Sequence, residues 1–374
     1  MAVSEVDVAV FEVDVAGPGF GRRRCGRGFV YLDCQGKRIS DPDVVARIKA
    51  LAIPPAWTDV WVCPHPRGHI QAVGVDARNR RQYRYHDEWR AARDRDKHDR
   101  MLDLARALPR LRRRLRRDLV TEDMGPDRVL AAAVRLLQLG LFRVGGEAYA
   151  VDNGSYGLAT LHKRHLRIRG DELRFDYPAK GGQRRIVVVR DPQVAEVVRA
   201  LKRRRGGGRE LLAYKDARGR WVDLRTPDIN RYLQEALGPD FSTKDFRTWT
   251  ATVLAAVALA AEEDAETDRQ RRRAVIRVVR DVARLLGNTP AVARGSYVDP
   301  RVIERYTDGE TVGDILDDRH VETVADEVSG ASDRDGDGGQ GDDENVAALD
   351  GVPESLLAEI EAAVVDLIDG SSSR

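Results

Sequence analysis

The spacing of apolar residues changes from an alternating to a helical period along this chain, and that change divides the fold into two parts. Residues 28–76 hold β-branched and aromatic residues between turn signals, as in GFVYLDCQGKRI, DVWVCP and HIQAVGVD, which is typical of strands. From Asp87 to about Leu119 the composition is helical, with an interruption expected near Pro109. The sequence therefore predicts an α+β protein with a small β-rich domain first and a mainly α-helical domain after it.

The second part is mostly helical but contains one predicted hairpin. Residues 127–142 have the apolar spacing of a buried helix that ends just before Arg143, and residues 192–287 return to a helical pattern. Between them, LRIRGDELRFDYPAKGGQRRIVVV alternates polar and apolar residues around a Gly-Gly turn. This alternation predicts a small β-sheet with Lys180 at the tip of a hairpin.

Charge also divides the chain. Residues 321–374 hold fifteen Asp and Glu against two Arg, a net charge of −13. Because the net charge of the whole chain is +2, residues 1–320 carry +15. A body this basic, with runs such as RLRRRLRRDL, indicates a polyanionic partner, most often nucleic acid. We expect a flexible arm over residues 1–20, a β-rich domain over 21–97, a mainly helical domain over 98–318 and an acidic, largely disordered tail over 319–374 with one short amphipathic stretch.

Composition also argues against several classes of protein. The longest apolar run, VLAAVALAA, is far shorter than a membrane span, and acidic residues interrupt the N-terminal stretch where a signal peptide would be apolar. Cys25, Cys34 and Cys63 form neither a C-x-x-C pair nor a zinc-binding spacing. We expect a soluble cytoplasmic protein with reduced thiols, no metal, no cofactor and no membrane partner.

Chemistry-bearing side chains occur in short, separate segments of the second part. They are Arg143 in LFRVGGEAY, Lys180 in YPAKGGQ, Lys244 and Arg247 in KDFRTWTAT, Asn288 in LGNTP and Tyr297 in ARGSYVDP. Together they supply what phosphodiester transesterification needs without a metal. Two guanidiniums grip the non-bridging phosphate oxygens, a tyrosine hydroxyl is a covalent nucleophile, and a lysine can give a proton to a leaving 5′-oxygen, which an arginine cannot.

In this order, the segments resemble the type IB DNA topoisomerases of the compact kind found in poxviruses and bacteria. The resemblance spans residues 28–310 and includes IPPAWTDVWVCP and GHIQAVGVDARNRRQYRYH in the first domain. It implies a tyrosine-recombinase-like catalytic core and a monomer that clamps duplex DNA with both domains, near the nucleoid. The implied activity is relaxation of supercoils by transient single-strand cleavage, a 3′-phosphotyrosine, strand rotation and religation, without ATP or metal.

The resemblance also implies a role for each side chain of these segments. Tyr297 would be the nucleophile, Arg143 and Arg247 the phosphate clamp, and Lys180 the general acid with Lys244 assisting it. Poxvirus members have a histidine where this chain has Asn288, whereas bacterial members share the asparagine. Because an amide does not titrate, Asn288 is left with a hydrogen bond to a non-bridging oxygen.

Further DNA contacts are expected from polar and aromatic side chains, most of them in NRRQYRYHDEWRAAR. Guanidiniums and phenols donate to phosphate, and an amide reads a base edge. The expected contacts are Arg80, Gln82, Tyr83, Tyr85, Arg93 and Tyr149. An alternative interpretation of the first five is an ordinary hairpin edge with cross-strand aromatic pairs.

Two other functions compete with the topoisomerase. A tyrosine recombinase shares the Arg, Lys, Arg and Tyr set, but that class usually has His-x-x-Arg where this chain has KDFR, and it begins with a helical domain. A non-enzymatic architectural DNA-binding protein would use the basic body only to coat phosphates. Such a protein leaves no covalent adduct on DNA, so adduct formation separates it from the enzyme.

Overall fold

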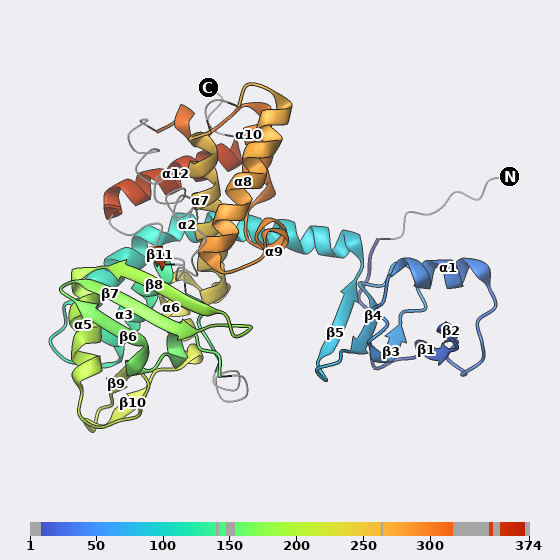
Figure 1. The fold of residues 1–374 in the computed structure, drawn as a ribbon, viewed down its shortest axis with the longest axis horizontal. Helices are drawn as coiled ribbons and strands as arrows, with labels where there is room; N and C mark the ends of the chain where they lie inside the picture. Colours follow the sequence, from blue (N-terminus) through green and yellow to red (C-terminus); the bar gives the residue numbers. More distant parts are fainter. Residues whose placement is uncertain are drawn as a thin grey trace, which may run out of the picture. The chain divides into compact units, whose positions relative to one another are not determined.

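The computed structural model describes residues 9–139, 142–146, 154–262, 265–316, 344–346 and 352–370. The chain forms two compact units, residues 1–98 and 99–374, and each is described by itself (Figure 1). The first unit is built on one β-sheet, and the second is mainly helical with small sheets. The predicted α+β class is therefore confirmed.

The first unit contains an antiparallel five-stranded sheet in the order β2-β1-β3-β4-β5. Its elements are β1 (Phe20–Cys25), β2 (Gly28–Leu32), α1 (Pro42–Ala50), β3 (Thr58–Val62), β4 (Ile70–Val75) and β5 (Arg81–Tyr85). Buried Ile48 of α1 packs on Val60, Val62 and Ala72 of the sheet to form a small core. By the strand order, β2 and β5 are the edge strands of this sheet.

Part of the segment expected to be a flexible arm is attached to this sheet. Phe11 exchanges backbone hydrogen bonds with Arg67 and His69, and the indole of Trp61 donates to the carbonyl of Gly17 at 3.1 Å. The backbone N–H of Val13 donates to the His69 ring at 2.9 Å. Residues 11–17 are therefore held in place, and residues 1–8 lie outside the described part of the chain.

One long helix, α2 (Asp87–Leu119), corrects the expected break at Pro109, because proline lies inside it. A proline within a helix removes one backbone hydrogen bond and costs about 3 kcal/mol. Leucines on both sides of it, among them Leu104, Leu108, Leu111 and Leu115, are buried in one core. Burial of this continuous apolar face outweighs the cost of the proline.

The second unit begins within α2 and contains both helices and strands. Its first part contains α3 (Pro126–Gln138), two 3-10 helices (Leu158–Thr160 and Lys163–His165), β6 (Leu166–Arg169), β7 (Glu172–Pro178), β8 (Arg184–Arg190), α5 (Pro192–Arg203), β9 (Ala213–Lys215), β10 (Trp221–Asp223) and α6 (Thr226–Leu237). Its second part contains α7 (Thr243–Ala260), α8 (Asp268–Leu286), α9 (Pro290–Ser296), α10 (Pro300–Asp308), a 3-10 helix (Val312–Asp314), β11 (Glu344–Val346) and α12 (Glu354–Asp369).

The predicted hairpin is confirmed, and a second one was missed. Strands β7 and β8 pair antiparallel around a turn in which Ala179 and Gln183 are hydrogen bonded, so Lys180 lies at the tip. They belong to a sheet in the order β11-β8-β7-β6. Residues 192–287 were expected to be helical throughout, but β9 and β10 form a short hairpin there. These strands have three residues each, too few to show a period of two.

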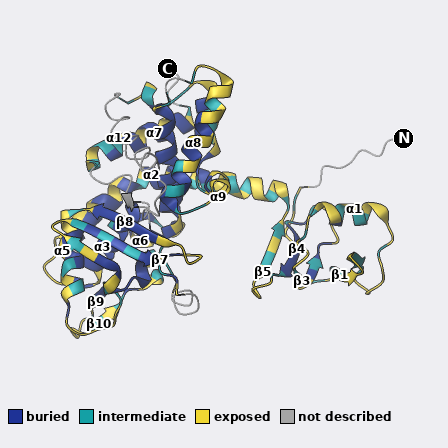
Figure 2. Cartoon of the chain, in the orientation of Figure 1, coloured by how far each residue is buried: buried dark blue, intermediate teal, exposed yellow. Residues whose placement is uncertain are grey.

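Helix α7 lies at the centre of the helical core. Every residue of α7 except Lys244 is buried, and Figure 2 shows this helix in dark blue. It packs against α3, α6, α8, α10 and α12. A helix enclosed in this way is held rigidly, so the side chains at its start have a fixed direction.

The short amphipathic stretch expected in the acidic tail forms helix α12. Helix α12 buries Leu357, Ile360, Val364 and Leu367 in the main core. The acidic residues fall mainly between these positions, so the helix keeps a charged outer face and an apolar inner face. Much of the remaining tail, residues 317–343 and 347–351, lies outside the described residues.

Candidate active site

Three arginines meet at the C-terminal end of α8. Arg185 donates to the carbonyl of Leu285, Arg247 to that of Leu286 at 2.7 Å, and Arg143 to that of Gly287 at 2.9 Å. The last carbonyls of a helix lack partners within it and carry the negative end of its dipole, so they attract cations. We call Arg143, Arg185 and Arg247 the arginine cluster.

A tight turn ends α8 and completes this arrangement. Gly287 has φ +60, and the N–H groups of Gly287 and Asn288 donate to the carbonyls of Arg284 and Ala283. A left-handed residue at this position is most often glycine. The carbonyls from Ala283 to Gly287 are thus each hydrogen bonded, the first two by backbone and the last three by arginine.

Arg143 follows α3 rather than ending it, since α3 stops at Gln138 and residues 140–141 lie outside the described part. Its neighbour Phe142 is fully buried, with its ring 5.0 Å from that of Phe175. The carbonyl of Arg143 accepts from the N–H of Leu158 at 2.8 Å. These contacts fix the backbone from which the guanidinium reaches Gly287.

Arg247 lies in the second turn of α7, whose start is capped by Asp245. The Asp245 carboxylate accepts from the backbone N–H of Ser242 at 2.7 Å and from its hydroxyl at 2.9 Å. Arg247 is 5% exposed, and the centre of its guanidinium lies 5.5 Å from the centre of the Tyr297 ring. The cation therefore lies beside the predicted nucleophile.

Tyr297 occupies the end of the short helix α9, which follows the α8 turn. Its backbone N–H donates to the carbonyl of Ala293 at 3.0 Å. The Thr252 hydroxyl accepts from the N–H of Asp299 at 3.1 Å, and its one proton lies between the carbonyls of Thr248, at 3.0 Å, and Tyr297, at 3.2 Å. Because Thr252 and Arg247 are both on α7, one rigid helix positions the tyrosine and the neighbouring cation.

Asn288 has its amide oriented by Arg143. The Arg143 guanidinium donates to Asn288 Oδ1 at 2.5 Å. The amide nitrogen Nδ2 is shielded from solvent and has no hydrogen-bond partner among the described residues. A buried donor without a partner is rare and often marks a site that binds a ligand.

The two lysines differ from the arginines in being exposed. Lys180 lies at the β7–β8 tip, and Lys244 is the exposed residue in the first turn of α7. Neither side chain belongs to the carbonyl-bound arrangement at the end of α8. The structure thus brings together Arg143, Arg247, Asn288 and Tyr297, and it leaves both lysines on the surface.

Arg185 was missed in the sequence. It is 7% exposed and pairs across the sheet with Tyr177, on the same face of β8 as fully buried Val187 and Val189. A charged residue in register with buried valines was the signal that could have found it. Tyr177 and Thr252 were missed as well, because a tyrosine in a strand and a threonine in a helix carry no such signal.

Burial and mutual repulsion perturb the ionisation of this cluster. Burial, followed by the positive charge of Arg143, lowers the pKa of Arg247 to about 10, and Tyr297 opposes this shift. Burial also lowers the pKa of Arg185, while it raises that of the Tyr177 phenol. Neighbouring guanidiniums whose charges are buried and repel one another are an arrangement that suits an anion.

The predicted DNA contacts of the first unit fall into two groups. Arg80 and Gln82 both hydrogen bond to the Asp76 carboxylate, at 2.7 Å and 3.0 Å, and the Arg80 hydrogen bonds lower the Asp76 pKa to about 2. Tyr83 and Tyr85 are 41% and 38% exposed and stack with ring centres 6.1 Å apart. Arg93 is exposed on α2, and Tyr149 lies outside the described residues.

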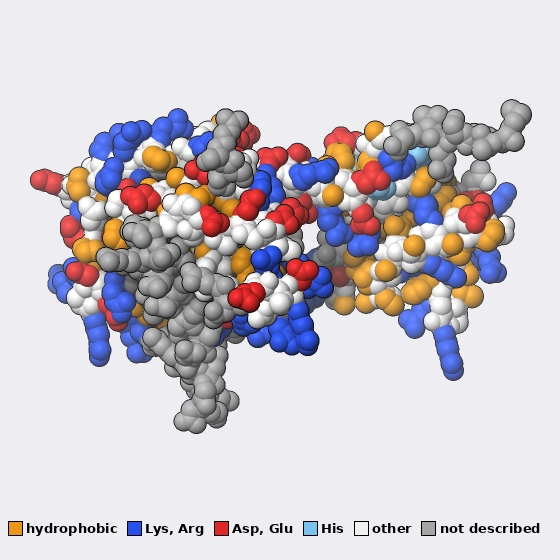
Figure 3. All heavy atoms as spheres, turned by 90° about the horizontal axis from the view of Figure 1, so that it is seen from above, with side chains coloured by type: hydrophobic (Ala, Val, Ile, Leu, Met, Phe, Trp, Pro, Cys, Tyr) orange, Lys and Arg blue, Asp and Glu red, His pale blue; other side chains and the backbone are white. Residues whose placement is uncertain are grey.

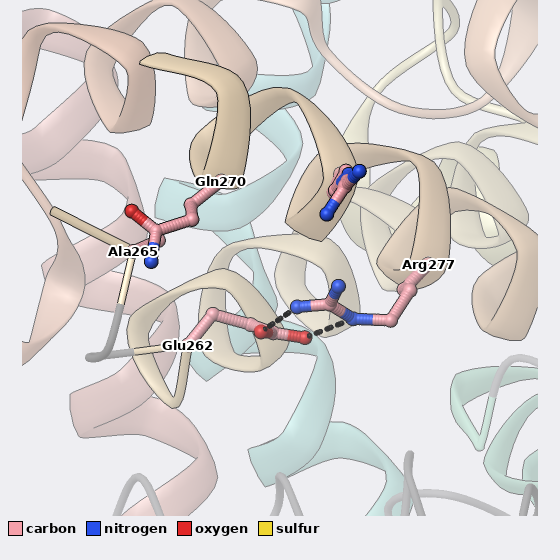
Figure 4. A pocket seen from close by; sticks show the side chains of 5 residues that line it. Glu262, Ala265, Gln270 and Arg277 are labelled. Carbon is pink, nitrogen blue, oxygen red and sulfur yellow. Dashed lines mark hydrogen bonds and ion pairs between the residues drawn. The ribbon is translucent and has the colours of Figure 1, made fainter. Parts of the chain in front are cut away.

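Other surface features do not extend the site. Figure 3 shows Lys and Arg side chains on both units with Asp and Glu among them. The pocket lined by Glu262, Ala265, Gln270, Arg273 and Arg277 lies near the start of α8, at the other end of that helix from the arginine cluster (Figure 4). Within the described ranges no group of three His, Cys, Asp or Glu side chains is arranged to hold a metal ion.

Comparisons with known proteins agree with this geometry. Residues 86–312 match the family model described as eukaryotic DNA topoisomerase I, catalytic core, and residues 28–76 match that of the bacterial DNA topoisomerase IB N-terminal domain. The chain is 30% identical over 295 residues to DNA topoisomerase 1B of Acanthamoeba polyphaga mimivirus, covering 77% of this chain and 87% of the relative.

A β-sheet unit followed in the chain by a mainly helical core, with a cluster of arginines beside a tyrosine, fits an enzyme that acts on DNA. The chain belongs to the type IB DNA topoisomerases, which relax DNA supercoils. None of the helices in the described part is both long and apolar enough for a membrane span.

Proposed function

We propose that this topoisomerase cleaves one strand of duplex DNA through Tyr297. The phenolic oxygen attacks the phosphorus, a bond forms between the two, and the bond from phosphorus to the 5′-oxygen breaks. The phenol proton passes to solvent, and the departing 5′-oxygen takes a proton from Lys180, with Lys244 assisting. The 5′ end then rotates, and attack by the 5′-hydroxyl on the 3′-phosphotyrosine restores the strand.

The observation that carries this proposal is the position of Arg247 beside the Tyr297 ring, within the arginine cluster. Each guanidinium has five N–H donors and uses only some of them on carbonyls. Arg143, and Arg247 through its charge beside Tyr297, suit the non-bridging oxygens of a phosphate, and Asn288 Nδ2 supplies one more donor. Since the carbonyls are neutral, these bonds leave the positive charge available for the transition state.

Both units take part in binding in this proposal. The exposed side chains of Tyr83, Tyr85 and Arg93 contact the DNA backbone. Arg80 and Gln82 are hydrogen bonded to Asp76, so they either break these hydrogen bonds to reach DNA or bind DNA while still bonded to Asp76. We further propose that the protein acts as a monomer in the cytoplasm. Neither ATP nor a metal is required, because the covalent link conserves the energy of the broken bond.

Plasmid relaxation tests the proposal. The protein should relax positive and negative supercoils with EDTA present and ATP absent. Tyr297→Phe should lose relaxation and the covalent adduct but keep its affinity for DNA, because it removes one oxygen and no positive charge. Tyr214→Phe removes the same atom from a half-buried tyrosine of β9 and should behave as the parent. An adduct formed by Tyr297→Phe would move the nucleophile elsewhere.

A further inference from the structure

Arg185 has no role in the proposed reaction, although it belongs to the arginine cluster. It is almost completely buried, and burial lowers the pKa of its guanidinium. It donates to the carbonyl of Leu285 and hydrogen bonds to the side chain of Tyr177. Burying a cation is costly, and hydrophobic replacements of buried ionic groups are often neutral or stabilising. Stability alone is therefore a weak reason for an arginine at this position.

The guanidinium of Arg185 lies directly against the turn that ends α8. A Cβ atom added to Gly287 would be 2.6 Å from Arg185 Nη1, which is closer than atoms approach without moving. The same turn presents the carbonyl of Gly287 and Oδ1 of Asn288, the two acceptors that orient Arg143. Arg185 thus contacts the turn from one side, and Arg143 binds it through these two oxygens.

We propose that Arg185 is a positioning residue: by binding the Leu285 carbonyl and the Tyr177 side chain, it holds the Gly287–Asn288 turn where Arg143 and Asn288 can grip the phosphate. This inference rests on the proposed function of those two residues. Arg185 acts through them rather than on DNA, because its side chain is buried and two acceptors already hold it.

The size of the effect follows from geometry. Loss of the Arg185 guanidinium frees the Leu285 carbonyl and opens space beneath Gly287, so the turn can move. A displacement of about 1 Å at a reacting group can slow a reaction by on the order of 10². DNA affinity depends mainly on many phosphate contacts spread over the protein and should hardly change.

The test measures single-turnover formation of the covalent adduct on a short DNA duplex, with affinity measured separately in the Tyr297→Phe background. We expect Arg185→Met to cleave about 10- to 100-fold more slowly with affinity within about threefold of the parent. Arg185→Lys should be intermediate, since a lysine keeps the charge but not the planar fork of donors. Arg190→Met is the matched control, because Arg190 lies on the same strand, is 55% exposed and pairs with Glu172, and it should cleave as the parent does.

A double-mutant cycle with Asn288→Ala decides whether Arg185 acts through the turn. The combined variant should cleave at least about threefold faster than the product of the two single defects predicts. Three results would overturn the inference. The double variant could cleave at the rate that the two single defects multiply to, Arg185→Met could lose as much DNA affinity as cleavage rate, or Arg185→Met could cleave at the parental rate. If Arg185→Met does not fold, the same cycle with Arg185→Lys gives the decision.

The parent protein separates this inference from the proposed function. If the parent forms its adduct on Tyr297 and the Arg185 variants match it, only the inference fails. If the parent forms no adduct, or Tyr297→Phe still forms one, the proposed function itself is wrong.

Discussion

Arg143 donates to Asn288 Oδ1 at 2.5 Å, although 145 positions separate the two residues in the chain. This bond fixes which end of the amide faces the site, so Nδ2 is the donor that remains. A neutral imidazole can likewise accept on one nitrogen and donate from the other. In the proposed reaction the Asn288 amide therefore donates from Nδ2, and a neutral imidazole at this position has the atoms to accept from Arg143 and donate to the phosphate in the same way.

Substitutions at Asn288 test this role. Asn288→Ala should slow single-turnover cleavage by about 10²- to 10³-fold, the usual loss for one donor to transition-state charge. Asn288→His should stay within about tenfold of the parent because the imidazole keeps both functions. Asn288→Asp should be slower than Asn288→Ala, because it keeps the acceptor for Arg143 but turns a carboxylate oxygen toward the phosphate. An Asn288→Asp variant as fast as the parent would show that Nδ2 does not face the phosphate.

The sequence predicted those parts of the molecule that depend on local pattern. Alternation around Gly-Gly gave the β7–β8 hairpin and the exposed tip at Lys180. The predicted helix break at Pro109 was wrong because a rule based on local sequence does not include the burial of the leucines on both sides of the proline. Alternation with Val187 and Val189 could have marked Arg185 as facing the core, but its contact with Gly287, 102 positions later in the chain, depends on the tertiary fold.

The tail shows a similar limit. Its composition is that of a disordered segment, and the sequence showed one short amphipathic stretch within it but not whether that stretch packs on the core. Apolar Leu357, Ile360, Val364 and Leu367 recur at helical spacing and bury against the core. Whether such a stretch docks or stays in solvent depends on the surface it meets, which the sequence does not display.

His165 should make stability depend on pH. Its ring is buried and stacked at 5.1 Å on that of His162, and burial, followed by the positive charges of His162 and Arg164, lowers its pKa from 6.5 to about 4. Between these values the unfolded chain binds a proton that the folded protein does not. The contribution of His165 to the free energy of unfolding is therefore fully present above pH 6.5. It is lost as the pH falls toward 4, by up to about 1.4 kcal/mol per pH unit.

Denaturant unfolding of the parent and of His165→Asn at pH 5 and pH 7.5 measures this dependence. The asparagine keeps an acceptor for the backbone N–H of His162, which donates to His165 Nδ1 at 3.1 Å. The same carboxylates titrate in the parent and in the variant. The difference between the two proteins in how their free energy of unfolding changes from pH 7.5 to pH 5 therefore reports on His165 alone. An equal change in the free energy of unfolding with pH in both proteins would mean that the fold does not lower the pKa of His165.

Glu361 should contribute strongly to stability through α12. Its carboxylate lies 2.7 Å from the Arg112 guanidinium, with both side chains less than 10% exposed, and accepts from Trp249 at 3.3 Å. Glu361→Ala leaves Arg112 buried without this partner and should cost about 3–5 kcal/mol. Glu354→Ala is the matched control on the same helix, because its pair with Arg116 is more exposed, and it should cost about 0–1 kcal/mol. Equal losses in urea unfolding would contradict a special role for the buried pair.

Lys180 is the catalytic assignment that the folded chain supports least directly, because its side chain is exposed at a hairpin tip. If Lys180 protonates the departing 5′-oxygen, Lys180→Ala should slow cleavage by about 10²- to 10⁴-fold with little change in DNA affinity. Gly181 and Gly182, with φ +85 and +76, form the turn without help from the lysine side chain, so the hairpin should persist in the variant.

A substrate with sulfur at the bridging 5′ position makes the test specific for proton transfer. A thiolate is a much weaker base than an alkoxide and leaves without a proton, so Lys180→Ala should cleave this substrate nearly as fast as the parent. Arg143→Ala and Arg247→Ala should stay slow on both substrates, because they lose charge stabilisation on the non-bridging oxygens. If sulfur rescues all three variants alike, or fails to rescue Lys180→Ala, the acid is a different group. Lys244, exposed in the first turn of α7, is then the next residue to test with the same pair of substrates.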